Sequence, residues 1–239
     1  MTTTMYLVRH GKTIYNQTGR VQGWKDSPLT EDGLEVARRC GLGLGDIPFD
    51  VAYSSDLERA AQTAKIILAE NDKEAIPLHL DADLREISFG HFDGGLNEDR
   101  ILASAEVLFG QADEVLLNEK LKAKEIRDRD MLNATYTLDE SGTAETFEMM
   151  QERAVKRIQT IFEEAYRDEA EHVLVVAHGV TIASIIDYFP GDKIQQIGDV
   201  KNASVSLLTF DGEEIQVVEI SSLRFVEKGA ALEQREGEN

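Results

Sequence analysis

The chain has 239 residues, of which 42% are hydrophobic and 29% are charged, and its formal net charge is −20 at pH 7. This composition suits one globular domain with a full core, with or without an insertion, and no apolar run approaches the length that spans a bilayer. The charge argues against nucleic acid and anionic membranes as partners, so a site for an anionic substrate requires a local cluster of positive groups.

The first residues lack the basic and apolar segments of a secretion signal. A single cysteine, Cys40, excludes an internal disulfide and suits a reducing compartment. We therefore expect a cytoplasmic protein in which Cys40 has a structural place on a helix.

An apolar run at residues 5–8 predicts a buried strand, and it ends in Arg9-His10-Gly11. Taken alone, these three residues are as typical of a surface turn. A second apolar run at 173–177 also ends in a histidine and a glycine, His178-Gly179. Because ligands bind at the carboxyl ends of strands in open α/β sheets, the two ends indicate one shared anion site.

The segment between these runs alternates helical and strand patterns. Residues 12–28 are predicted to form a polar loop, and Thr30 to cap a helix that reaches about Leu44 and is ended by Gly43, Gly45 and Pro48. Further expected elements are a strand at 49–53, a helix capped by Ser54, Ser55 or Asp56, and a strand at 76–80.

Residues 92–143 break this alternation and are predicted to form a helical insertion over the site. A long helix at 143–167, a strand at 172–177 and a helix at 180–188 are expected to follow. Strands at 204–210 and 214–220 flank Asp211-Gly212, a strong hairpin signal.

These elements predict an α/β three-layer sandwich, with a mostly parallel central sheet, helices on both faces and an antiparallel C-terminal hairpin. We expect residues 1–226 to form one domain that carries the insertion. Residues 227–239 are expected to be a polar, frayed tail.

Four segments resemble, in order, the motifs of one known family. They are Leu7-Val8-Arg9-His10-Gly11-Lys12-Thr13 with Asn16, residues 54–64 around Arg59, Leu84-Arg85-Glu86-Ile87-Ser88-Phe89-Gly90 and Val176-Ala177-His178-Gly179. Asn202-Ala203-Ser204-Val205 also looks like that family's C-terminal strand. By these residues the chain resembles branch 1 of the histidine phosphatase superfamily, the phosphoglycerate mutase-like proteins. The resemblance covers about residues 4–90 and 143–220 and leaves 92–143 unmatched.

The resemblance implies that His10 is the nucleophile and forms a phosphohistidine, which water then hydrolyses. A phosphomonoester repels nucleophiles through its own charge, so phosphoryl transfer requires positive groups around the equatorial oxygens. Arg9 and Arg59 would provide bidentate guanidinium groups for this purpose. Glu86 would be the general acid, and His178 would donate a hydrogen bond to a phosphate oxygen. Without the motif, Glu86 is one of 45 acidic residues and has no claim to a catalytic role.

Weaker candidates for phosphate binding are Asn16, Gln22 and the Gly23 backbone in the first loop. The amide of Gly179 is a further candidate, because N–H groups at a helix start favour anions.

His10 attacks only if one ring nitrogen is unprotonated. We expect Arg9, Arg59 and a charged His178 to keep His10 neutral in the free protein. Glu86 requires the opposite condition, because a general acid must hold a proton near neutral pH.

We expect no metal and no other cofactor, since no histidine pair shows zinc-site spacing and one cysteine cannot build a thiolate site. The expected ligand is a small phosphorylated metabolite. The oligomeric state, monomer or homodimer, stays open.

The resemblance leaves phosphomonoester hydrolysis and a phosphoglycerate mutase-type transfer as alternatives. Mutases carry a basic stretch after the glutamate motif, whereas residues 90–100 here are acidic, so we favour a phosphatase. Downstream cations are interleaved with acids and are expected to form a solvated helix face: Arg100, Lys120, Lys122, Lys124, Arg127 and Arg129. A third alternative is a non-catalytic protein that binds a phospholigand on the same fold.

Overall fold

The computed structural model describes residues 1–71, 76–191 and 200–237. Within these residues the strands form one sheet in the order β3-β2-β4-β1-β5-β6. Their bounds are β1 Thr3–Arg9, β2 Val51–Ser55, β3 Leu78–Asp81, β4 His172–Ala177, β5 Val205–Phe210 and β6 Ile215–Ser222. β2 pairs in parallel with β3 and β4, and β4 pairs in parallel with β1. β5 is antiparallel to β1 and β6, which confirms the predicted C-terminal hairpin.

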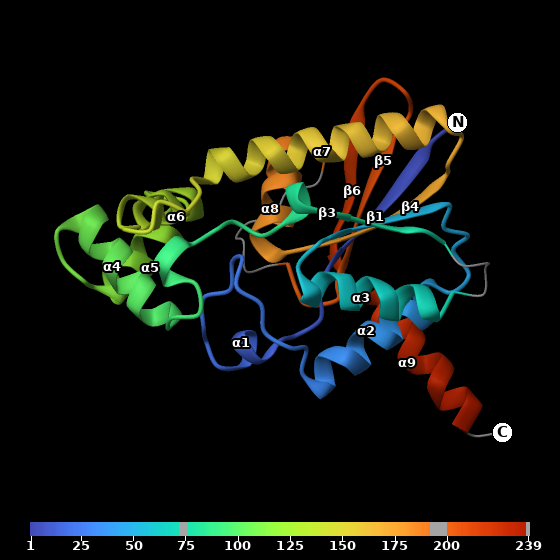
Figure 1. Ribbon diagram of the computed structural model, residues 1–239, viewed down its shortest axis with the longest axis horizontal. Helices are drawn as coiled ribbons and strands as arrows, with labels where there is room; N and C mark the ends of the chain where they lie inside the picture. Colours follow the sequence, from blue (N-terminus) through green and yellow to red (C-terminus); the bar gives the residue numbers. More distant parts are fainter. Residues whose placement is uncertain (72–75, 192–199, 238–239) are drawn as a thin grey trace.

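Helices cover both faces of this sheet (Figure 1). α7 (Phe147–Arg167) and α8 (Gly179–Tyr188) lie on one face, and α2 (Glu31–Leu44), α3 (Glu58–Ala69) and α9 (Arg224–Gly237) lie on the other. Successive side chains of a strand point to opposite faces. Thus Met5 and Leu7 pack with residues of α7 and α8, whereas Tyr6 and Val8 pack with α2, α3 and α9. The predicted three-layer α/β sandwich is confirmed.

Of the two predicted helix caps, the cap of α2 is confirmed and the cap of α3 is not. Thr30 caps α2, as predicted, because its hydroxyl accepts a hydrogen bond from the Gly33 amide at 2.9 Å. The prediction that Ser54, Ser55 or Asp56 caps α3 was wrong: β2 continues through Ser55, and Leu57 is the residue before the helix. Asp26 from the first loop accepts the Glu58 amide at 2.6 Å and takes over the capping.

Several boundaries shift by a few residues. The loop at 12–28 contains a short helix, α1 (Ile14–Gln17), closed by a capping box between Thr13 and Asn16. α7 begins at Phe147 rather than at 143, because an Asp139 oxygen accepts the amides of residues 143 and 144 and holds them outside the helix. β2 and β3 each begin two residues later than predicted.

The insertion is helical, as predicted. Short turns η1 (Ala82–Leu84) and η2 (Gly90–Phe92) precede α4 (Asn97–Phe109), α5 (Glu114–Lys122) and α6 (Asp128–Thr137). The three helices gather at one end of the molecule, on the side of α1 and therefore beyond the carboxyl end of β1 (Figure 1). Leu132 of α6 packs with Phe147 and Met150 of α7, which joins the insertion to the sandwich.

The prediction of a frayed polar tail at 227–239 was wrong for the residues described. α9 continues to residue 237 and packs along α2, and residues 238–239 lie outside the described ranges. A Cβ on Gly43 would stand 1.8 Å from the carbonyl oxygen of Phe225, and one on Gly229 would stand 1.9 Å from that of Arg39. Gly43 therefore lies inside α2, where it lets two backbones touch, instead of ending the helix.

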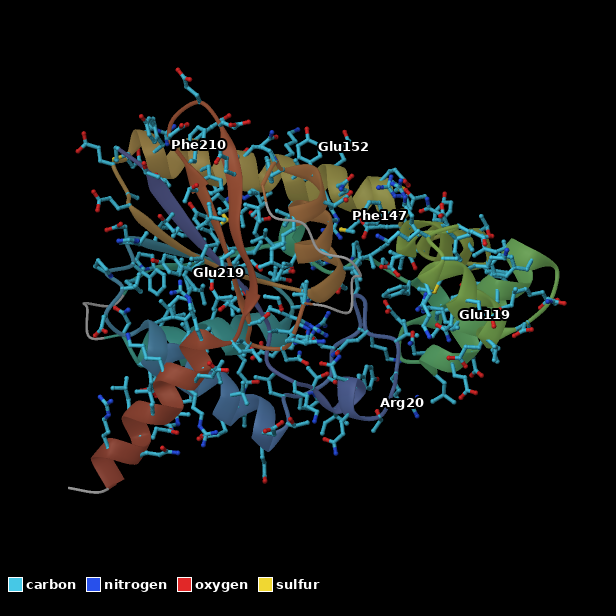
Figure 2. The ribbon with its side chains drawn as sticks, turned by 180° about the vertical axis from the view of Figure 1, so that it is seen from behind. Arg20, Glu119, Phe147, Glu152, Phe210 and Glu219 are labelled. Atoms are coloured by element: carbon cyan, nitrogen blue, oxygen red, sulfur yellow. The ribbon has the colours of Figure 1, made fainter. Side chains whose placement is uncertain are left out.

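Cys40 is fully buried on α2, and burial raises the pKa of its thiol to about 12, in accord with a structural place. Glu119 and Glu152 are among the exposed acidic side chains (Figure 2). In the described ranges, no helix is both long enough and apolar enough to cross a membrane.

Candidate active site

The parallel pairing of β1 with β4 brings the two histidine motifs together. Arg9 is in register with Ala177, so His10 and His178 leave neighbouring strands at the same edge. The His10 amide donates to the Ala177 carbonyl at 3.0 Å, and the two imidazole rings lie 5.2 Å apart between centroids. Both side chains are buried, with 3% and 0% of each residue exposed.

The tautomer of His10 follows from a hydrogen bond of its ring to the backbone. Nδ1 lies 2.7 Å from the carbonyl oxygen of Gly11, which can only accept, so a neutral ring carries its hydrogen on Nδ1. The lone pair is then on Nε2. This arrangement leaves a nucleophilic nitrogen in a ring whose orientation is set by the backbone.

Burial lowers the pKa of His10 well below the usual histidine value, and the charges of Arg59 and Arg9 lower it further. The predicted neutral His10 is therefore confirmed in direction, although burial outweighs the arginines as its cause. The pKa of His178 is also lowered well below its usual value, first by burial and then by Arg59. The expected contribution from a charged His178 was wrong, because an imidazole removed from water beside two guanidinium groups does not gain a proton.

The two arginines reach the same place from different elements. Arg9 ends β1 and donates from Nη1 to the Val200 carbonyl at 2.6 Å. Arg59 lies in the first turn of α3, and its buried guanidinium donates to Asp26 at 2.6 Å and to the Gly23 carbonyl at 2.7 Å. Burial is the main cause that lowers the pKa of each arginine, and Glu86 opposes it.

Four buried nitrogens of this cluster make no hydrogen bond within the described residues. They are Nε of Arg9, Nε of Arg59 and both ring nitrogens of His178. Buried polar groups in native proteins are almost always partnered. The two guanidinium nitrogens and the single N–H of a neutral His178 are donors, so they indicate a ligand with several acceptor oxygens. A phosphate has that chemistry.

Glu86 closes the cluster from the segment before η2. Its Oε1 accepts the amides of Ile87 and Thr181 and the hydroxyl of Thr181 at 3.0–3.1 Å, and its Oε2 accepts the amide of Val180 at 3.0 Å. The carboxyl group therefore lies at the N-terminus of α8, where the helix dipole favours an anion. Its charge acts on Arg9 and Arg59, which places it beside the cationic groups.

Residues that the sequence did not single out hold the Glu86 segment in place. Arg153 of α7 donates to the carbonyls of Asp83, Arg85 and Glu86 at 2.8–2.9 Å and pairs with Glu145. Trp24 donates from its indole nitrogen to the same Glu86 carbonyl at 2.9 Å. No spacing in the sequence distinguishes these residues from other surface residues.

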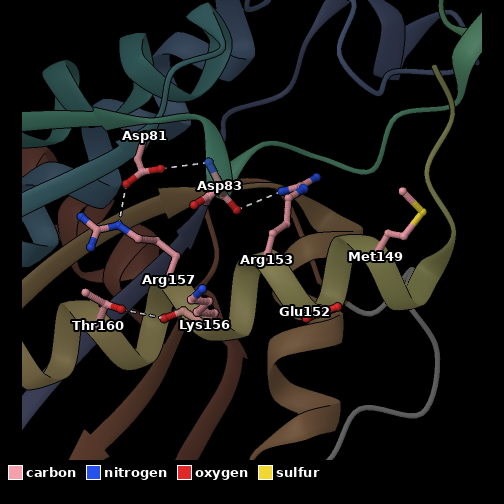
Figure 3. A pocket seen from close by; sticks show the side chains of 8 residues that line it. All are labelled: Asp81, Asp83, Met149, Glu152, Arg153, Lys156, Arg157 and Thr160. Carbon is pink, nitrogen blue, oxygen red and sulfur yellow. Dashed lines mark hydrogen bonds and ion pairs between the residues drawn. The ribbon is translucent and has the colours of Figure 1, made fainter.

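A hollow beside α7 is lined in part by Arg153 and lies apart from the histidine cluster (Figure 3). It holds Asp81, Asp83 and Arg157 in addition to Arg153, and Arg157 is already paired with Asp81 at 2.5 Å. Neither histidine of the cluster lines it.

Of the weaker candidates for phosphate binding, two lie next to the cluster and two make contacts within the first loop. Gly179 begins α8 against Arg9, since a Cβ there would stand 3.4 Å from the guanidinium carbon. Asn16 joins the site through its Oδ1, which lies 3.4 Å from Nδ2 of Asn202. Asn202 also donates to the His10 carbonyl at 3.0 Å and is a supporting residue for which the sequence assigned no role.

Gln22 and Gly23 serve the loop itself. The Gln22 amide is bonded to Thr13 and Ser27 at 2.7 and 3.2 Å. The Gly23 amide donates to Asp93 at 2.7 Å and the Gly23 carbonyl orients Arg59, and the binding of phosphate by the Gly23 backbone stays a prediction. Asp93, which follows η2, thus ties the first loop to the glutamate motif.

The expectation that Arg100 lies on a solvated helix face was wrong. It is 5% exposed, and its guanidinium donates to Asn97 and Thr135 and lies 5.1 Å from the centre of the Phe89 ring. Burial lowers its pKa to about 10. The packing of α4 against α6 removes this cation from water.

Within the described ranges, no group of three or more His, Cys, Asp or Glu side chains is arranged to hold a metal ion. The cluster consists instead of guanidinium and imidazole donors around one carboxyl group. Its chemistry is that of an anion site.

The profile of the Histidine phosphatase superfamily (branch 1) matches residues 5–222, and the chain belongs to this superfamily. A crystal structure of phosphoglycerate mutase from Bacillus anthracis str. Sterne has a TM-score of 0.85 and 33% identity, covering 96% of this chain and 97% of that one. "2,3-bisphosphoglycerate-dependent phosphoglycerate mutase 2" of Gloeobacter violaceus is 28% identical over 81% of this chain and 80% of its own length. "Putative phosphoserine phosphatase 2" of Hydrogenobacter thermophilus is 28% identical over 92% and 95%. Phosphoryl transfer is common to these names.

Proposed function

We propose that this protein is a phosphomonoester hydrolase that acts through a phosphohistidine on His10. One observation carries the proposal: His10, whose lone pair is on Nε2, is buried 5.2 Å from the His178 ring and within the charge of Arg9 and Arg59, and buried nitrogens of these three neighbours lack protein partners in the described residues. A phosphate in this position would have its oxygens bound and its phosphorus within reach of the nucleophile.

The reaction consists of two displacements. In the first, His10 Nε2 attacks phosphorus, the P–O bond to the leaving group breaks, and the leaving oxygen takes a proton from Glu86. In the second, water attacks the phosphohistidine and gives a proton to Glu86, which regenerates the acid. Arg9 and Arg59 stabilise the charge on the transferred group in both steps, so the proposed reaction uses no metal ion.

A phosphoglycerate mutase-type transfer is the second candidate, and it is favoured by the names of the relatives. A mutase must bind a phosphorylated carboxylate, which requires cations beyond the catalytic cluster. In the insertion, Arg100 is buried against neutral partners, Lys120 is paired with Glu125, and Arg129 is paired with Asp187. The engagement of these three cations of the insertion supports hydrolysis over transfer.

A protein that binds a phospholigand without turnover is the third candidate. Binding alone requires neither a nucleophile nor an acid, whereas this cluster contains His10 and Glu86 together. The proposal also includes a cytoplasmic location and one small phosphorylated metabolite as the ligand. A panel of phosphomonoesters is the direct way to identify that metabolite.

The test compares the wild type with His10→Ala on p-nitrophenyl phosphate. The exposed His79 on β3 provides the matched control, His79→Ala. We expect turnover and an acid-labile phosphoenzyme in the wild type and the control, and neither in His10→Ala. Turnover that survives His10→Ala would refute the proposal. Isomerisation of 3-phosphoglycerate with 2,3-bisphosphoglycerate present, faster than hydrolysis, would establish the mutase instead.

A further inference from the structure

The hydroxyl of Thr181 lies between two oxygens that both accept hydrogen bonds. Thr181 is fully buried in the first turn of α8. Its Oγ1 is 2.9 Å from the Arg85 carbonyl oxygen and 3.0 Å from Glu86 Oε1, and its amide also donates to Oε1 at 3.0 Å.

A hydroxyl has one hydrogen and two lone pairs. If Glu86 is a carboxylate, Thr181 donates to Oε1, and the Arg85 carbonyl keeps the hydrogen bond from Arg153 at 2.8 Å. If Oε1 carries a proton, Glu86 donates to Thr181 Oγ1, and the threonine hydrogen turns to the Arg85 carbonyl. Both forms of the carboxyl group therefore have a bonded partner in the same geometry.

We propose that Thr181 is a positioning residue that holds Glu86 in both of its protonation states; this inference rests on the proposed function. When the P–O bond breaks, its electron pair stays on the leaving oxygen, and the proton on Glu86 Oε1 turns from Thr181 Oγ1 to that oxygen and is transferred to it. Glu86 becomes a carboxylate, and the Thr181 hydrogen moves from the Arg85 carbonyl to Oε1. The attacking water later returns a proton to Glu86, and the hydroxyl turns back.

The role predicts a dependence on the leaving group. Phenyl phosphate and p-nitrophenyl phosphate have similar shapes, but phenoxide is the more basic leaving group and depends more on a general acid. The value of kcat/KM reports the steps up to phosphohistidine formation, so it isolates the proton transfer to the leaving group.

The experiment measures kcat/KM for both esters in the wild type, Thr181→Val and Thr181→Ser. We expect Thr181→Val to reduce kcat/KM about tenfold or more for phenyl phosphate and less than about threefold for p-nitrophenyl phosphate, within the range of general acid catalysis. Thr181→Ser keeps the hydroxyl and should restore both values. In a Glu86→Gln background, Thr181→Val should add almost nothing, because the two residues act as one unit.

Ser184→Ala is the matched control, because Ser184 is a buried hydroxyl on α8 that bonds to the Thr181 carbonyl and Met150 but not to Glu86. It should leave the ratio between the two esters unchanged. If Thr181→Val lowers kcat/KM equally for both esters, Thr181 has only a structural role and the inference is overturned. If Thr181→Val does not fold, the same comparison with Thr181→Ala decides the question. A wild type inactive on both esters would refute the proposed function itself, and the inference with it.

Discussion

Replacing Arg59 with alanine removes a guanidinium group whose charge acts on both histidines of the cluster. The side chain is wholly buried, and Asp26 and the Gly23 carbonyl hold two of its nitrogens. The third, Nε, is bonded to nothing within the described residues. The substitution therefore takes away an oriented donor and a positive charge in a site from which water is excluded.

The expected magnitude follows from these contacts. Removing one oriented donor to a developing oxyanion costs about 2.7–4 kcal/mol, which lowers kcat/KM about 10²–10³-fold. Arg59→Lys keeps the charge but loses the planar fork, so it should recover part of this loss. Arg59 is fully buried, so Arg59→Ala also leaves a cavity and unpairs Asp26, and a loss of folding stability is expected beside the loss of activity.

The assay measures kcat/KM on p-nitrophenyl phosphate together with urea unfolding for each variant. Arg20→Ala is the control, because this exposed arginine donates to the Gly94 carbonyl outside the cluster. A loss in kcat/KM below tenfold for Arg59→Ala, with the fold intact, would contradict the proposed place of Arg59. Full activity in Arg59→Lys would show that its geometry is irrelevant.

Three further outcomes are expected. Gly43→Ala and Gly229→Ala should each lower stability by about 1–3 kcal/mol, because backbone atoms of α2 and α9 cannot yield to a methyl group; unchanged melting temperatures would contradict the close crossing. Burial lowers the pKa of His10 and His178 in the folded protein, so below about pH 6.5 the unfolded chain binds more protons than the folded one. The free energy of unfolding should therefore decrease as the pH is lowered through this range, by up to about 1.4 kcal/mol per pH unit for each histidine. His178→Asn should reduce that slope in urea titrations between pH 7 and 5, and an unaltered slope would count against a neutral His178. Activity should persist in EDTA, and loss on chelation with recovery on added Mg²⁺ or Zn²⁺ would refute a metal-free reaction.

The strand-end motifs were predictable because the buried apolar residues and the polar functional residues are adjacent in the sequence. An apolar run followed by Arg9-His10 or by His178 marks both a strand and the functional group that it carries. Parallel pairing then places the groups at one edge without further information. Thr30 was predictable for a similar reason, since a helix cap is a local hydrogen bond.

Asp26, Asp93, Arg153 and Thr181 were not predictable in this way. Each acts through a contact with a residue far away in the chain, and none stands in a pattern that separates it from other polar residues. In a chain with 45 acidic residues, the one carboxylate that orients Arg59 has no local mark. These supports determine how accurately the catalytic groups are held.

The sequence by itself determined the layered α/β fold, the location of the proposed nucleophile and of both arginines, and the family, because periodicity and short motifs are properties of neighbouring residues. Tertiary structure alone decided that α9 covers α2 rather than fraying, that Arg100 is buried, and that Gly23 serves Arg59. The reason is physical. A polar C-terminal helix, an arginine or a glycine amide finds its partner through packing between distant segments, and the free energy of that packing is not contained in any local stretch of chain.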